Sequence, residues 1–133
     1  MRMGGSEYFY MTAKKKVLSV EMDEGDDVIK SIEQAMRDNS IRESSVQSIE
    51  GVIKSGIMNT FNGNKYLAIV LDNTSILNAS GNFQLGKEEL FGGLNVSAKL
   101  AKATTGRLAS AVAGKGLKVS LLFYKEEPRE KKP

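Results

Sequence analysis

The 133-residue sequence contains neither cysteine nor histidine. Without cysteine, the chain can form no disulfide, no cysteine zinc finger and no thiol nucleophile. Without histidine, it has no Ser-His-Asp triad, no histidine general base and no histidine metal ligand. The remaining carboxylates, Lys, Tyr and Ser form no recognisable catalytic set. The sequence therefore predicts a protein that is not an enzyme and that holds no metal or other cofactor.

Long apolar segments are also absent. No run approaches the roughly 18 apolar residues of a membrane span, and the N-terminal stretch MRMGGSEYFYM lacks the apolar core of a signal peptide. We therefore expect a cytoplasmic protein without membrane contact. The length suits one domain, which we place at residues 1–124. Residues 125–133, KEEPREKKP, have nothing apolar to bury, so the sequence predicts a disordered tail there.

The charges are unevenly spread, although the net charge is only +3. Residues 21–43 contain eight acids and three bases, whereas residues 87–118 contain six bases and two acids. A basic segment of this kind is typical of a surface that meets nucleic acid phosphates. The alternative is that these charges only solvate the surface. The candidate nucleic-acid-binding residues are Lys99, Lys102, Arg107, Lys115 and Lys118.

One amphipathic helix is predicted, over residues 26–38. Its apolar residues recur at helical spacing and form one stripe, and two aspartates at its start favour a helix N-terminus. The stripe consists of Val28, Ile29, Ile32, Ala35 and Met36.

Most of the remaining chain reads as short β-strands. Asn62-Gly63 before the apolar run 66–71 indicates a hairpin. The pattern of residues 101–116 does not decide between a helix and a second hairpin. The pattern predicts eight or nine short strands, at residues 7–11, 16–22, 44–61 (with bulges or close approaches at Gly51 and Gly56), 66–71, 75–85, 92–100 and 117–124. The predicted fold class is α+β, a mostly antiparallel sheet of short strands with one long amphipathic helix packed on it.

Three stretches together resemble the PPC domain, the plant and prokaryote conserved domain. They are SVEMDEGDDVIKSIEQAMRDNSI, SSVQSIEGVIKSGIM and ILNASGN, and the resemblance covers residues 16–124. It implies a homotrimer of prokaryotic type. It also implies DNA binding, because prokaryotic members are commonly described as DNA-binding candidates. No AT-hook and no base-reading element is present, so we expect weak, sequence-independent phosphate contacts.

The resemblance also implies a lost metal site. Many prokaryotic members carry a His-x-His pair and a third histidine that resemble a zinc site. The corresponding positions here are assigned to Gly93, Asn95 and Val112, so all three ligands are absent. The second functional hypothesis is therefore a small-molecule-binding or enzymatic trimer that uses a vestigial pocket around Asn95. The residues assigned to this pocket are Asn78, Ser80, Gly93, Asn95, Ser97 and Val112.

Overall fold

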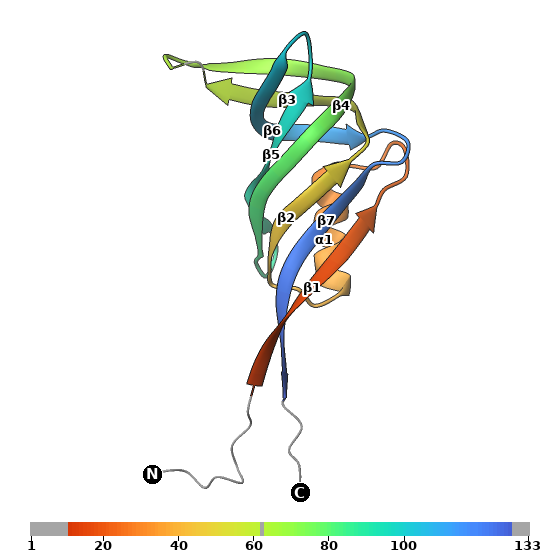
Figure 1. Cartoon of the computed structure of the whole chain (residues 1–133), viewed down its shortest axis with the longest axis vertical. Helices are drawn as coiled ribbons and strands as arrows, with labels where there is room; N and C mark the ends of the chain where they lie inside the picture. Colours follow the sequence, from red (N-terminus) through yellow and green to blue (C-terminus); the bar gives the residue numbers. More distant parts are fainter. Residues whose placement is uncertain (1–10, 62, 129–133) are drawn as a thin grey trace, which may run out of the picture.

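A computed structural model of the protein describes residues 11–61 and 63–128. Within these residues the chain forms seven strands and one helix (Figure 1). In chain order the elements are β1 (Met11–Glu21), α1 (Val28–Asp38), β2 (Glu43–Glu50), β3 (Val52–Phe61), β4 (Tyr66–Leu85), β5 (Leu90–Lys99), β6 (Ala103–Ala113) and β7 (Lys118–Pro128).

All seven strands belong to one antiparallel sheet, in the order β1-β7-β2-β4-β3-β6-β5. The 20-residue strand β4 has three partners: its first half pairs with β3, its second half pairs with β5, and residues 82–84 also pair with β2. Strands β4, β3, β6 and β5 therefore form a closed ring of pairings. On the other side of β4, strands β2, β7 and β1 continue the sheet, and β1 and β7 extend downward as a two-stranded ribbon (Figure 1).

The helix is shorter than predicted, and the sheet dominates the fold. Asp27 caps α1 by accepting a hydrogen bond from the backbone N–H of Lys30 (2.9 Å), so the helix begins at Val28. It ends after 11 residues, because Asn39 caps it and Ser40 has a positive φ of 55°. The predicted α+β fold with a long amphipathic helix is therefore wrong: the protein is mostly antiparallel β, with one helix of about three turns.

The predicted strands are fewer and longer in the structure. The strand predicted at residues 7–11 lies outside the described residues except for Met11. The separate strands predicted at 66–71 and 75–85 are both parts of β4, and residues 103–113 of the ambiguous segment form strand β6. Gly51 lies between β2 and β3 with a φ of 120°, and a Cβ there would lie 2.9 Å from the Cα of Leu117. Gly51 is thus a close approach between two backbones, as expected.

The C-terminal segment bears on the predicted domain boundary. Strand β7 continues to Pro128, where its last residues pair with the start of β1. Residues 125–128 of the segment predicted as a tail thus belong to a strand, and residues 129–133 lie outside the described part of the chain. The extent of the domain stays a prediction.

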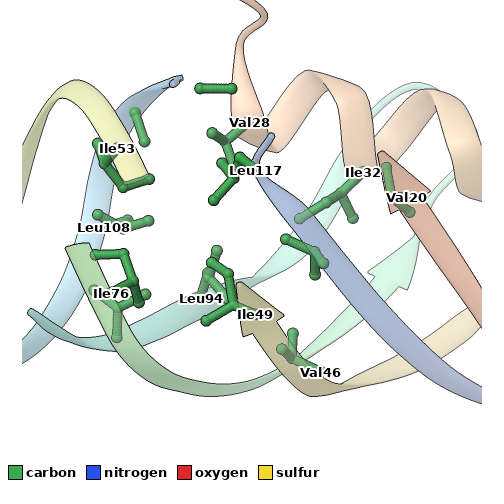
Figure 2. Close-up of a cluster of buried hydrophobic side chains, with 14 of the residues drawn as sticks. Val20, Val28, Ile32, Val46, Ile49, Ile53, Ile76, Leu94, Leu108 and Leu117 are labelled. Carbon is green, nitrogen blue, oxygen red and sulfur yellow. The ribbon is translucent and has the colours of Figure 1, made fainter. Parts of the chain in front are cut away.

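The core lies between the inner face of the sheet and the helix. Val28 and Ile32 of α1 are fully buried and lie in one cluster with Leu117 and Val20 (Figure 2). Ile53, Leu94 and other strand residues complete the same cluster. Because these alternating strand residues fill the interior, their sequence neighbours face outward, and this alternation positions the site described next.

Candidate functional site

Polar side chains from three neighbouring strands meet on the outer face of the sheet. The register pairs Asn78 with Ser97, Ser80 with Asn95, and Asn82 with Gly93 across β4 and β5. On the next strand, β6, Thr105 lies opposite Ser97 and Arg107 lies opposite Asn95. We call this set the polar face: Asn78, Ser80, Asn82, Gly93, Asn95, Ser97, Thr105 and Arg107.

Alternation along the strands explains why the polar face points outward. Leu94, Val96 and Leu108 are buried, so the residues between them lie on the opposite side of their strands. The hydroxyls of Ser97 and Thr105 are hydrogen-bonded across the strand pair, 2.8 Å apart. Five of the six residues assigned to the vestigial pocket thus occupy one surface.

Val112, the sixth assigned residue, lies elsewhere. It pairs with Ser55 on β3 and forms an isolated bridge with Asp27 before the helix. The residue of β6 opposite Asn95 is Arg107. Sequence reasoning missed this neighbour because it left residues 101–116 open between a helix and a hairpin. A hairpin turning near Ala101 would have indicated it, since Asn95 and Arg107 are equally far from that turn.

Arg107 lies directly against the backbone of β5. Its Nη2 donates a hydrogen bond to the carbonyl oxygen of Gly92 (2.7 Å). A Cβ built on Gly93 would lie 2.5 Å from the Cζ, Nε and Nη2 atoms of Arg107. The guanidinium therefore occupies the space that a side chain at position 93 would need.

The polar face offers a metal ion no suitable ligands. In residues 11–61 and 63–128, no three His, Cys, Asp or Glu residues come together in a way that could hold a metal. The side chains present are amides, hydroxyls and a guanidinium, whereas zinc requires histidine nitrogen, thiolate or carboxylate. The positive charge of Arg107 would also repel a cation there. A metal therefore does not fit this site.

The five basic candidate residues do not gather into one patch. Lys99 and Lys102 lie at the turn between β5 and β6, whereas Lys115 and Lys118 lie beyond the other end of β6. The 11 residues of β6 separate the two pairs by roughly 30 Å along the strand. Lys118 is also ion-paired with Glu50 (3.6 Å), and Arg107 lies on the polar face.

The β3–β4 and β5–β6 turns lie at one end of the molecule. The charged residues of these two hairpins near the turns are all basic. Residues 51–71 and 90–125 contain no Asp or Glu. The two hairpins are joined where the hydroxyl of Thr60 donates to the carbonyl oxygen of Thr105 (2.9 Å), and Lys99 and Lys102 are exposed. We call the turn between β5 and β6, with its residues Lys99 and Lys102, the hairpin end (top of Figure 1).

An apolar surface covers the outer side of β3 and the first half of β4. Ile57 lies directly opposite Val70, and Phe61 lies opposite Tyr66, with the two rings 4.9 Å apart. All four are exposed, Val70 and Tyr66 at 74%. We call Ile57, Phe61, Tyr66 and Val70 the apolar stripe. The exposed pair Asn59 and Ala68 lies between the two apolar pairs on the same strands.

Comparison with known proteins identifies the family. The sequence profile of the "Plants and Prokaryotes Conserved (PCC) domain", the PPC domain named above, matches residues 11–121. The chain belongs to this family. None of the curated protein sequences compared with the chain matched it. No helix in the described part of the chain is both long and apolar enough to cross a membrane.

Solved structures share the fold. A metal-containing protein from Archaeoglobus fulgidus is 22% identical, with a TM-score of 0.70, and the match covers 94% of this chain and 90% of that one. A plant- and prokaryote-conserved (PPC) protein from Pyrococcus horikoshii is 20% identical, with a TM-score of 0.65 and coverage of 100% and 91%. A "Putative DNA-binding protein" from Ralstonia eutropha JMP134 is 15% identical, with a TM-score of 0.65 and coverage of 82% and 76%.

Proposed function

We propose that this PPC domain is a non-enzymatic DNA-binding protein that contacts phosphates weakly and without reading sequence. Membership of the family supports this, as does the likeness to structures named as DNA-binding candidates. The observation that carries the proposal is the hairpin end, where Lys99 and Lys102 are exposed on hairpins that contain no acidic residue. Such a surface attracts the phosphate backbone of DNA.

The fold argues for sequence-independent contact. The only helix of the described residues, α1, buries Val28, Ile32 and Met36 against the sheet and is not presented for insertion into a major groove. Lysines at a turn are point charges that contact phosphates and carry no base information. We therefore expect a dissociation constant no tighter than roughly micromolar at physiological salt.

The acting form is proposed to be a homotrimer. The apolar stripe supports self-association, because burying Ile57, Phe61, Tyr66 and Val70 against a second copy would remove them from water. A trimer would also present the hairpin end three times, so that weak contacts gain in avidity on one DNA molecule.

The test is fluorescence anisotropy with random-sequence duplex DNA at about 50 mM salt, where electrostatic binding is strongest. The double variant Lys99→Ala with Lys102→Ala should bind at least about tenfold more weakly, because it loses two phosphate contacts. The matched control is Lys115→Ala with Lys118→Ala, which removes the same charge at the other end of β6. It should bind nearly as the parent does. Absence of binding by the parent, or equal loss in both variants, would contradict the proposal.

A further inference from the structure

We propose that a cavity beside Arg107 binds a small organic carboxylate with a compact apolar body. The cavity has a volume of about 310 Å³ and lies between α1 and strands β4, β5 and β6. Volumes from about 300 Å³ upward are typical of small-molecule sites. The residues that matter for recognition are Arg107 and four apolar neighbours, Ile29, Phe83, Leu90 and Leu108.

The charge of Arg107 has no anionic partner in the described part of the chain. Ion pairs of the described residues, such as Arg37 with Glu33, Lys54 with Glu24 and Lys118 with Glu50, do not include Arg107. Of the five N–H donors of the guanidinium, one is used, by the carbonyl oxygen of Gly92. The remaining donors can bind a carboxylate in the paired geometry that arginine favours.

The guanidinium is also held in position. It lies against the backbone of Gly93, 2.5 Å from where a Cβ would be, and is tied to the neighbouring carbonyl of Gly92. This hydrogen bond orients the exposed guanidinium before a ligand binds, which lowers the entropy lost on binding. Gly93 permits this arrangement, since any larger residue there would displace the guanidinium.

The apolar residues that line the cavity indicate the chemistry of the rest of the ligand. Phe83 and Leu108 are buried and Ile29 and Leu90 are half-buried, whereas Arg107 is exposed, so the cavity combines an apolar wall with a solvated cation. A compact apolar group would fill this space favourably. Arg107 is the only charged residue that lines the cavity, so a single negative charge on the ligand matches it. This inference is independent of the DNA-binding proposal, which uses Lys99 and Lys102.

Benzoate is the probe and neutral benzamide is its isosteric control. The full chain, labelled with ¹⁵N, is titrated with each compound, and the Nε–H signal of Arg107 is followed by NMR. Benzoate should shift this signal with saturation at roughly millimolar concentrations, as expected for a ligand of this size. Benzamide should require at least tenfold higher concentration. Equal shifts from the two compounds, or no shift from benzoate, would overturn the proposal.

Three variants locate the binding site by benzoate-induced shifts of the backbone signals around the cavity. Arg107→Gln should weaken benzoate binding at least tenfold, while Arg107→Lys, which keeps the charge but loses the paired donors, should weaken it less. Lys102→Gln removes the same charge from the hairpin end and should bind benzoate as the parent does. Undiminished binding by Arg107→Gln, or equal loss in Lys102→Gln, would show a general charge effect and refute the assignment. The parent titration tests the proposal even where a variant fails to fold.

Discussion

The guanidinium of Arg107 fills the space beside Gly93. A Cβ on Gly93 would lie 2.5 Å from the Cζ of Arg107, well inside van der Waals contact. The two residues are thus matched across strands β5 and β6: with a side chain at position 93, the guanidinium of Arg107 would have to move away from this position. This pair stands on the polar face, next to Asn95, where the family resemblance assigns a lost metal site.

The purified protein should hold no stoichiometric zinc, because the polar face has no imidazole, thiolate or carboxylate ligand to offer. Elemental analysis after dialysis measures this directly. One zinc per chain would contradict it.

The same geometry predicts that a zinc site can be installed. Combining Gly93→His, Asn95→His and Arg107→His places three imidazoles on adjacent positions of one strand pair, with residue 95 directly opposite residue 107. The change at 107 also frees the space that a side chain at 93 needs. We expect this triple variant to bind about one zinc per chain, measured by elemental analysis and by a zinc-dependent rise in melting temperature.

The control for this installation replaces Arg107→His with Val112→His. Position 112 pairs with Ser55 on β3 and is not on the polar face. This second triple variant should bind no stoichiometric zinc. Equal zinc binding by the two variants would show that the register does not define the site.

Close backbone packing predicts that Gly81 tolerates no side chain. Its φ is 141°, and a Cβ there would overlap the carbonyl oxygen of Gly93 on the paired strand. Gly81→Ala should lower the free energy of unfolding by about 3 kcal/mol, from overlap and backbone strain together. Gly116→Ala is the control, because Gly116 also has a positive φ (79°) but has open space around it. It should lose about 1 kcal/mol. Urea unfolding compares the two, and similar losses would refute the packing argument.

The apolar stripe predicts the assembly state. Light scattering of the parent should give three times the chain mass across micromolar concentrations, and Val70→Asp should reduce the mass to that of one chain. Val70 is 74% exposed in the single chain, so the change should otherwise alter stability little. Ser48→Asp, at an exposed position on β2, should leave the mass unchanged. A monomeric parent would contradict the prediction, as would a Val70→Asp variant that stays trimeric.

The hairpin end predicts how DNA binding depends on salt. The slope of log affinity against log salt should flatten by about 0.9 for each lysine contact that is removed. Lys99→Ala with Lys102→Ala should therefore flatten it measurably, whereas Lys115→Ala with Lys118→Ala should leave it unchanged. Anisotropy titrations between about 25 and 150 mM salt give both slopes. Parallel slopes for the parent and the first variant would place the contacts elsewhere.

Local pattern determined much of this molecule in advance. The helical spacing of the apolar residues between positions 28 and 36 and the capping Asp27 define α1. A helix repeats every 3.6 residues, and its ends need hydrogen-bond partners. Strands β3 and β4 pair antiparallel up to Phe61 and Tyr66, which confirms the hairpin predicted from Asn62-Gly63. The three family stretches identified the PPC domain, since together they report the order of strand, helix and glycine turns.

Only the tertiary structure decided how these elements combine. Sequence could not show that β4 runs for 20 residues and pairs with three other strands, because pairing between distant strands depends on contacts that no local window contains. It also left residues 101–116 open, since alanine and threonine suit either a helix or a strand until neighbours are present. The strand register then placed Arg107 beside Gly93 and Asn95 and moved Val112 away, because in a sheet the partner strand determines which side chains meet.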